Sequence, residues 1–359
     1  MMSLPDHLSY PPIFEGALKE GVFLARPNRF IVICQLDDSQ ERVYMPNPGR
    51  LGELLVPGAR LILGDYGEHN NRKTRYTVMA VHYHGSIIFL HTHLNNHVAR
   101  ALVESGGIPS LRDWKIIAQE VKHGHSRFDF LLRSDTTEMM LEVKSCTLAA
   151  NGIAMFPDAI TERGRRHLQE LAELNASGHG SGVLFVIHHP AVTHFLPDYH
   201  SDLAFSETFR DIGDRLPIFA VSIDWASNLR YQISVPEVTI PWSTILSEVG
   251  NQGHVLAVLE EKDAFHITLS PFSDDISSGL RIEAEKVYPI RSSIDMSAVM
   301  VDRLKDNYGQ PSKSAKQEIT GWDFKCPVNP IYTSRFQELL LSFRMPPRLT
   351  GEIPPPQAK

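Results

Sequence analysis

One stretch, residues 126–147 (SRFDFLLRSDTTEMMLEVKSCT), constrains the fold and the chemistry of this chain more than any other. Residues 127–133 alternate and are rich in Phe and Leu, and a second strand-like run follows the turn-forming Ser-Asp-Thr-Thr. This pattern predicts two neighbouring strands. Side chains two positions apart on a strand share a face, so Glu142 and Lys144 are expected to point the same way, with Asp129 on the neighbouring strand.

These three charged side chains indicate a divalent-cation site. Charges in a largely apolar strand are costly unless they are paired or used. Two carboxylates from adjacent strands suit Mg²⁺, which needs only a few carboxylates besides water and substrate phosphate. A lysine two residues beyond Glu142 could orient the water that attacks a phosphate. The alternative interpretation is a surface ion pair between Glu142 and Lys144 on an edge strand.

Composition limits the class of protein. A chain of 359 residues, 42% hydrophobic and 21% charged, is an ordinary globular protein with room for two or three domains. The net charge of −7 shows no overall basic character, so any phosphate-binding surface must be local. The chain has no signal-peptide pattern and no apolar run near the ~18 residues of a membrane span, which predicts a cytoplasmic protein without a membrane partner.

The first part of the chain predicts a small barrel. Short strands with Gly and Pro punctuation over residues 14–90 favour an OB-like barrel, a fold that often binds single strands in a groove. Arg26, Arg29 and Arg50 are basic residues available to such a groove, and Pro46-Asn47-Pro48-Gly49 forms a rigid loop that could aim Arg50 at a phosphate. Four aromatic side chains are candidate stacking platforms: Phe23, Phe30, Tyr44 and Tyr76. The alternative is that the aromatics are core residues and the charges are merely solvated.

The middle of the chain predicts a mixed sheet flanked by helices. The expected order is a helix at 96–105, three strands at 114–122, 127–133 and 138–147, a helix from Ala159 to about Asn175, and a buried strand at 182–188. Asp158 is the expected N-cap of the second helix. Arg163 and His167 lie on one face of that helix and would contact phosphate beside the carboxylates.

The string RFDF…LEVKS…FPDAITERGRRHLQEL resembles the sugar fermentation stimulation protein A (SfsA) family, whose catalytic part is similar to the PD-(D/E)XK nucleases. The resemblance spans about residues 12–235 and implies an OB-like domain followed by a restriction-endonuclease-like domain. It also implies hydrolysis of DNA or RNA with Mg²⁺ or Mn²⁺. Asp129 and Glu142 would hold the metal, with Glu104 or Glu120 as an additional acid, and Lys144 would be the catalytic lysine. The expected nucleic-acid contacts are Arg26, Arg29, Asn47, Arg50, Arg163 and His167.

The expected fold class is therefore α/β (α+β). Its parts are an OB-like nucleic-acid-binding domain at 1–90, a nuclease-like domain at 91–240, a small α+β domain at 241–345 and a Pro-rich tail at 346–359. In the third part, residues 254–270 predict a hairpin, and 297–309 and 335–343 predict helices. A homo-oligomer is compatible with this plan.

Two functions fit this fold. The first is a metal-dependent nuclease, and the second is a non-catalytic DNA-binding regulator of sugar metabolism that retains a nuclease fold. The intact trio of Asp129, Glu142 and Lys144 favours the enzyme, because two carboxylates facing a phosphate would repel it without a cation.

Overall fold

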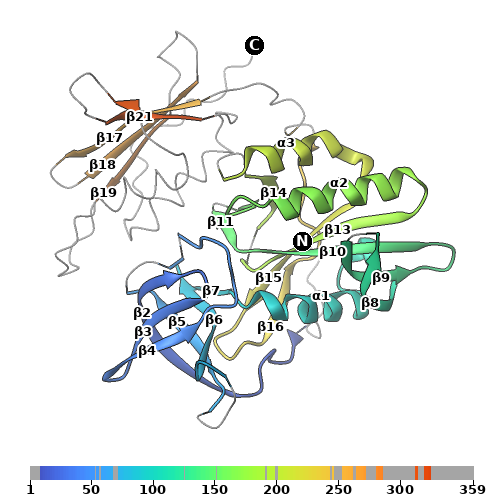
Figure 1. Cartoon of the computed structure of the whole chain (residues 1–359), viewed down its shortest axis with the longest axis horizontal. Coiled ribbons are helices and arrows are strands. Elements are labelled where there is room, and N and C mark those ends of the chain that lie inside the picture. The colour runs from blue at the N-terminus through green and yellow to red at the C-terminus, as the bar shows by residue number, and fades with distance from the viewer. Residues whose placement is uncertain are drawn as a thin grey trace.

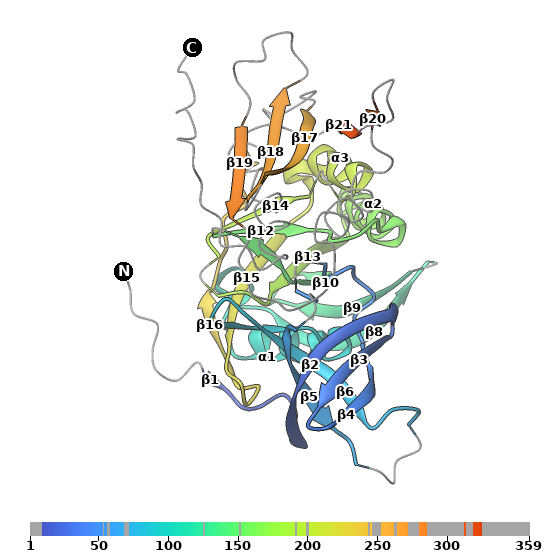
Figure 2. The ribbon, with the colours of Figure 1, turned by 90° about the vertical axis from the view of Figure 1, so that its left-hand side faces the viewer.

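The computed structural model describes residues 9–245, apart from residues 53, 56–57, 68–71, 125, 151, 191, 199–200 and 243–244, together with five strand segments beyond residue 245. Within residues 9–245 the strands form a six-stranded barrel, a seven-stranded mixed sheet and a three-stranded sheet. The barrel and the seven-stranded sheet lie side by side in two views at right angles (Figure 1, Figure 2). The predicted order of an OB-like domain followed by a nuclease-like domain is confirmed.

The barrel closes on itself through a short pairing between β4 and β6. Its strand order is β4-β3-β2-β5-β6-β7, and Tyr44 of β4 pairs with Thr77 of β6 to close it. Phe23 and Tyr76 lie among the buried residues of its core, which contradicts their role as stacking platforms, whereas Phe30 is exposed and Tyr44 is half-buried. The strands are β2 (Ala17–Asn28), β3 (Ile31–Leu36), β4 (Ser39–Tyr44), β5 (Arg60–Asp65), β6 (Tyr76–Tyr83) and β7 (Ser86–Phe89).

The seven-stranded sheet carries the candidate carboxylates on two neighbouring strands, β9 and β10. Its order is β1-β16-β15-β13-β10-β9-β8, with β10/β13 and β13/β15 parallel and the other neighbours antiparallel. Tyr10 of β1 pairs with Tyr231 of β16, so the first described residues belong to this sheet and not to the barrel. The strands are β1 (Ser9–Tyr10), β8 (Lys115–His123), β9 (Ser126–Arg133), β10 (Glu138–Cys146), β13 (Gly180–Ile187), β15 (Ile218–Trp225) and β16 (Tyr231–Val235).

Helices cover both faces of this sheet (Figure 1). On one face, α1 (Asn95–Glu104) packs in a core that contains Leu141 and Val143 of β10. On the other face, α2 (Glu162–Ala176) and α3 (Leu203–Ile212) pack over β13 in a second core. None of the helices that the structure describes has the length and the apolar run that crossing a membrane requires. Short 3-10 turns η1 (Thr92–Leu94), η2 (Pro109–Leu111) and η3 (Gly213–Arg215) complete this part of the chain.

The prediction that Asp158 caps the second helix is wrong. The N-cap is Thr161, whose hydroxyl accepts a hydrogen bond from the Gly164 N–H at 3.1 Å. Asp202, the N-cap of α3, also accepts from the Thr161 N–H at 2.8 Å, which ties the starts of the two helices together. Both Asp158 and Thr161 are good capping residues, so only the packing of the surrounding elements decides between them.

A small sheet, which the strand patterns did not predict, combines two strands that lie between β10 and α2 in the chain with one strand that follows β13. It contains β11 (Leu148–Ala150), β12 (Ile153–Phe156) and β14 (His194–Pro197). Strands of three and four residues are too short to show the alternation on which the prediction of a strand rests.

The strand segments beyond residue 245 form a sheet of order β19-β18-β17-β21-β20. The antiparallel pair of β17 (Gly253–Glu261) and β18 (Ala264–Pro271) agrees with the hairpin predicted at 254–270. The other strands are β19 (Leu280–Glu285), β20 (Ser312–Lys313) and β21 (Ile319–Phe324). The helices predicted at 297–309 and 335–343 and the Pro-rich tail lie outside the described residues.

Candidate functional site

Asp129 lies where strands β9 and β10 separate. The ladder between them ends at the pair Leu141–Phe130. Beyond it, the Val143 N–H donates to Asp129 Oδ2 at 2.7 Å, so the carboxylate takes the place of a backbone acceptor. Asn96 of α1 donates from Nδ2 to Asp129 Oδ1 at 2.7 Å. The carboxylate is therefore held from two sides, by a strand and by the first turn of a helix.

Glu142 lies on the opposite face of β10 from Val143, as the alternation of the strand predicts, and is only 5% exposed. Its Oε1 accepts hydrogen bonds from Lys144 Nζ at 2.5 Å and from His167 Nδ1 at 2.7 Å. Among the described residues, its Oε2 is buried and has no hydrogen-bond partner. One oxygen of this carboxylate thus accepts two hydrogen bonds, and the other, among the described residues, accepts none.

His167, which was predicted to contact nucleic acid, is a partner of Glu142 in the structure. The residue is only 2% exposed, so a phosphate cannot reach it. Arg163, one helical turn earlier, donates from Nε to His167 Nε2 at 3.4 Å. Because Nε2 accepts, Nδ1 carries the proton that is donated to Glu142. Arg163 itself is exposed at the start of α2, where it remains available to a phosphate.

The two carboxyl groups influence each other's charge. The pKa of Asp129 is raised, first by burial and then by the negative charge of Glu142. The hydrogen bonds from Val143 and Asn96 act to lower this pKa but do not outweigh the two raising effects. Burial also favours a higher pKa for Glu142, but the hydrogen bond from His167 and the charge of Lys144 outweigh it and lower that pKa. The charge of Lys144 also acts to lower the pKa of Asp129, but burial and the charge of Glu142 outweigh it, so Glu142 is the better compensated carboxylate of the pair.

Neither candidate for the additional acid belongs to this pair. Glu104 forms an ion pair with Arg100 on α1 at 2.7 Å, and Glu120 forms one with Arg127 at 2.7 Å; both glutamates are exposed. The amide of Asn96 occupies the position beside Asp129 instead. Within the described residues, no three His, Cys, Asp or Glu side chains are grouped closely enough to hold a metal.

The guanidinium of Arg26, another predicted nucleic-acid contact, forms its hydrogen bonds inside the barrel domain. Nη1 donates to the carbonyls of Gly49 and Arg50 at 2.7 and 2.9 Å. Nη2 donates to the carbonyls of Asn47 and Arg29 at 2.7 and 2.9 Å. Asn47, also a predicted nucleic-acid contact, is buried, and its Oδ1 accepts from the Gly49 N–H at 2.9 Å, so it too shapes the loop. Of the arginines predicted in this region, Arg29 is exposed and Arg50 is partly exposed.

The loop at 46–51 connects the barrel to the start of α2. The Leu51 N–H donates to Asp158 Oδ2 at 3.4 Å. A side chain at Gly49 would place its Cβ only 2.3 Å from the same oxygen, so the loop approaches Asp158 as closely as glycine permits. Asp158 therefore binds the barrel loop and does not cap α2, and this contact brings Arg50 towards the helix that carries Arg163.

Sequence reasoning missed the residues that anchor α1. Asn95 is buried, and its Oδ1 accepts a hydrogen bond from His188 Nε2 at 2.8 Å. His188 in turn accepts on Nδ1 from the indole N–H of Trp225 at 3.2 Å. This chain of contacts fixes the helix start from which Asn96 reaches Asp129. The only signal in the sequence is the Asn-Asn pair at the start of a predicted helix, which indicates a helix start but no partner.

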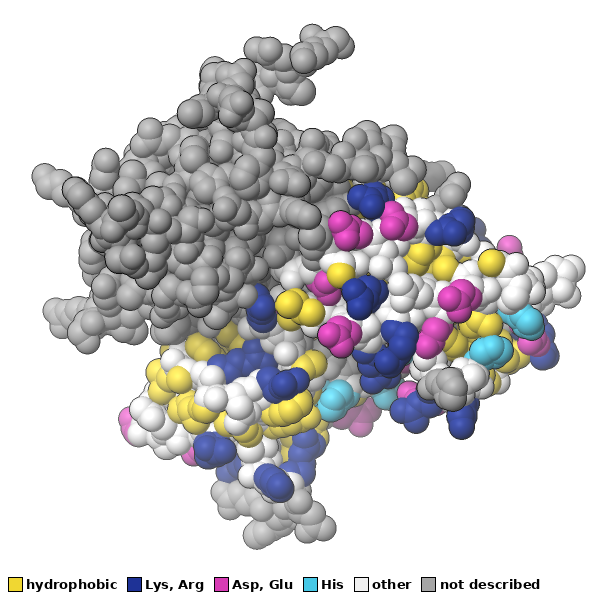
Figure 3. Space-filling model, turned by 45° about the horizontal axis from the view of Figure 1, so that its top comes forward, with side chains coloured by type: hydrophobic (Ala, Val, Ile, Leu, Met, Phe, Trp, Pro, Cys, Tyr) yellow, Lys and Arg dark blue, Asp and Glu magenta, His cyan; other side chains and the backbone are white. Residues whose placement is uncertain are grey.

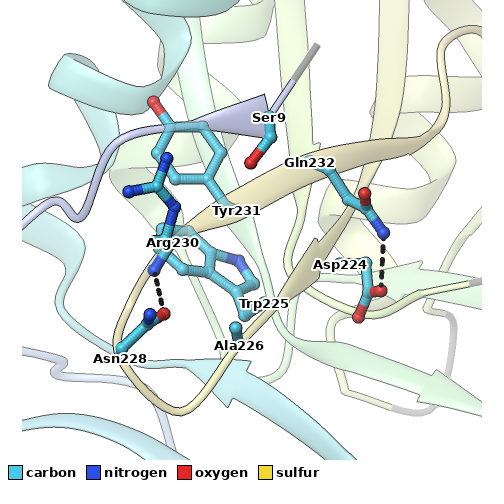
Figure 4. A pocket seen from close by; sticks show the side chains of 8 residues that line it. All are labelled: Ser9, Asp224, Trp225, Ala226, Asn228, Arg230, Tyr231 and Gln232. Atoms are coloured by element: carbon cyan, nitrogen blue, oxygen red, sulfur yellow. Dashed lines mark hydrogen bonds between the residues drawn. The ribbon is translucent and has the colours of Figure 1, made fainter. Parts of the chain in front are cut away.

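A second candidate site lies at the opposite edge of the sheet. A pocket of about 250 Å³ opens beside β15 and β16 and is lined by Asp224, Arg230 and Gln232 among others (Figure 4). Gln232 Nε2 donates to Asp224 Oδ2 at 3.2 Å. Its wall offers one carboxylate already bound to an amide, which is a weaker indication of metal chemistry than the pair on β9 and β10.

Comparison with known proteins agrees with this fold. Residues 24–90 match the SfsA N-terminal OB domain, and residues 93–227 match the sugar fermentation stimulation protein RE domain. A sugar fermentation stimulation protein homolog from Methanothermobacter thermautotrophicus is 37% identical over 198 residues, which cover 55% of this chain and 82% of that one. The homolog from Clostridium tetani is 39% identical over 197 residues, 54% of this chain and 85% of that one.

A solved structure is also similar. The structure of Pyrococcus furiosus SfsA in complex with Ca²⁺ has a TM-score of 0.59 and 28% sequence identity, and the similarity covers 64% of this chain and 99% of that one. The matched regions contain both the barrel and the sheet with its carboxylate pair. This chain belongs to the sugar fermentation stimulation protein family.

Proposed function

We propose that this protein is a metal-dependent nuclease that hydrolyses phosphodiester bonds of DNA or RNA. The observation that carries the proposal is the buried Oε2 of Glu142, which has no partner among the described residues and belongs to a carboxylate whose charge raises the pKa of Asp129. A buried carboxylate oxygen without a partner costs free energy, and a bound ligand would remove that cost. Two carboxylates that repel each other indicate that this ligand is a cation.

The residues present fit a hard divalent cation. Asp129 and Glu142 supply only oxygen atoms, which Mg²⁺ and Mn²⁺ accept. Mg²⁺ keeps several waters and takes few protein ligands, so a pair of carboxylates without a third acid suffices. The P. furiosus relative solved in complex with Ca²⁺ supports the same choice, because Ca²⁺ also prefers oxygen ligands.

Each side chain then has a definite task. Asn96 and the Val143 N–H hold Asp129 in place, and His167 holds Glu142. When bound, the cation would neutralise charge on the phosphate and make water a better nucleophile. Lys144, hydrogen-bonded to Glu142, would orient that water and stabilise negative charge that develops on the phosphate.

The direct test compares wild type with Lys144→Ala on labelled single- and double-stranded DNA and RNA, with Mg²⁺, Mn²⁺ or EDTA. Loss of a positioning group should reduce the cleavage rate by roughly 10²–10⁴-fold while nucleic-acid binding changes little. Lys115→Ala, which alters an exposed lysine on β8, is the matched control and should cut like wild type. Equal cleavage by wild type and Lys144→Ala would show that the activity does not come from this site.

Metal binding can be tested without activity. A ligand that binds only the folded state raises the melting temperature, so millimolar Mg²⁺ or Mn²⁺ should stabilise the wild type. Asp129→Asn should lose most of that shift because one charged ligand is gone. If no divalent ion shifts the melting temperature and no substrate is cut, yet DNA is bound, the non-catalytic regulator replaces the nuclease as the function.

A further inference from the structure

Few large hydrophobic side chains are exposed on the described surface. They are Val22, Phe30, Ile117 and Ile160, with exposed fractions of 39%, 47%, 41% and 69%. Phe30 is the aromatic one, and it lies in the turn between β2 and β3. An exposed phenylalanine in a tight turn makes no contribution to the barrel core, so its position calls for another explanation.

A second ring, that of Tyr44, lies on the strand next to the turn that carries Phe30. Ile31, the next residue, pairs with Tyr44 across the β3–β4 ladder, and the Met45 N–H donates to the Phe30 carbonyl at 2.9 Å. Tyr44 is half-buried, on the outward face of β4. The backbone of the turn that carries Phe30 is therefore bonded to the chain beside Tyr44.

A third ring leads from the barrel towards the carboxylates. The rings of Tyr44 and His93 lie 6.3 Å apart, centroid to centroid. His93 is exposed and sits in η1, the turn that runs directly into α1. Three residues later, Asn96 donates its hydrogen bond to Asp129. We call Phe30, Tyr44 and His93 the ring series: the rings of the last two are neighbours, and Phe30 lies in the adjoining turn of the barrel.

Positive charge accompanies these rings. The guanidinium of Arg29 lies 5.8 Å from the centre of the Phe30 ring. Arg42, exposed and two residues before Tyr44 on β4, lies on the same face of that strand. On the face of the molecule shown in Figure 3, Lys and Arg side chains are interspersed with hydrophobic ones across the barrel. Rings alternating with cations suit a strand with both accessible bases and phosphates.

We infer that the ring series binds the unpaired bases of a single-stranded nucleic acid and leads that strand to Asp129 and Glu142. Bases in a duplex are already stacked on each other and cannot lie on protein rings, whereas every unpaired base offers a face. Arg29 and Arg42 contact the phosphates of the same strand. This inference rests on the proposed function, because it names the class of substrate that the nuclease site receives.

The experiment measures binding in EDTA, where cleavage is suppressed. Wild type, Phe30→Ala and His93→Ala are titrated with a fluorescent 16-nucleotide oligo-dT, with the same backbone carrying abasic sites, and with a duplex of the same length. Loss of one stacked base should weaken binding of oligo-dT by roughly 5- to 100-fold and leave the abasic strand and the duplex unchanged. Val22→Ala, which removes an exposed side chain near the other end of the β2–β3 ladder, is the matched control.

The abasic strand separates base stacking from phosphate contact. If wild type binds the abasic strand or the duplex as tightly as oligo-dT, or if Phe30→Ala and His93→Ala bind oligo-dT like Val22→Ala, the inference is overturned. Folding of each variant is checked by thermal melting, and Phe30→Leu, which keeps an apolar side chain without a ring, should bind like Phe30→Ala. Ring-dependent binding that persists while no metal supports cleavage would refute the nuclease but leave the ring series as the strand-binding surface.

Discussion

Replacing Arg26 by methionine should destabilise the barrel domain strongly. The change keeps the apolar stem but removes the four hydrogen bonds that the guanidinium donates to the carbonyls of Arg29, Asn47, Gly49 and Arg50. Hydrogen bonds to a charged group contribute about 1.5–3 kcal/mol each. Their sum overstates the effect, because a released loop can regain water at its carbonyls.

A second effect reduces the loss further. Burial lowers the pKa of Arg26, and its Nε is buried without a partner in the described part of the chain, so the folded state carries a cost that methionine removes. The charge of Asp158 offsets part of that cost. Weighing these contributions, we expect a loss of about 3 kcal/mol in the free energy of unfolding, the lower end of the range for breaking a buried charged contact.

Urea unfolding monitored by circular dichroism measures the change. Arg29→Met is the matched control, because it makes the same substitution at an exposed arginine in the adjoining turn and should cost under about 0.5 kcal/mol. Arg26→Lys should recover little, since one ammonium group cannot reach all four carbonyls. If Arg26→Met unfolds at the same urea concentration as Arg29→Met, the four bonds do not hold the loop and the reasoning is refuted.

Two further predictions concern the anchors of the site. Burial lowers the pKa of His188 to about 3, far below its ordinary ~6.5. Between these two pH values the imidazole is protonated in the unfolded chain but neutral in the folded protein, so the free energy of unfolding falls as the pH drops from ~6.5 to about 3. His188→Gln should reduce the slope of unfolding free energy against pH between 4 and 6 by about 1.4 kcal/mol per unit; an unchanged slope would mean that His188 is not the group responsible. Gly49→Ala should cost about 1–3 kcal/mol because its Cβ meets Asp158, and adding Asp158→Ala should recover part of that loss. In thermal melts, strictly additive effects of the two substitutions would contradict that contact.

Local pattern was sufficient to place the three central residues on their strands. Alternation along β10 put Glu142 and Lys144 on one face and Val143 on the other, because a strand turns each side chain by half a revolution whatever lies around it. The order of strands and helices could also be predicted, since turn residues and apolar periodicity are properties of short segments.

The partners of the polar side chains were decided only by the tertiary structure. Asn96 meets Asp129 from 33 residues away, and His167 meets Glu142 from 25 residues away. No local pattern records which helix lies over which strand. Sequence reasoning therefore assigned His167 and Arg26 to a phosphate, although packing buries the first against Glu142 and surrounds the second with carbonyls. A long polar side chain binds whatever group the folded chain brings within its reach, and that choice is made by contacts distant in sequence.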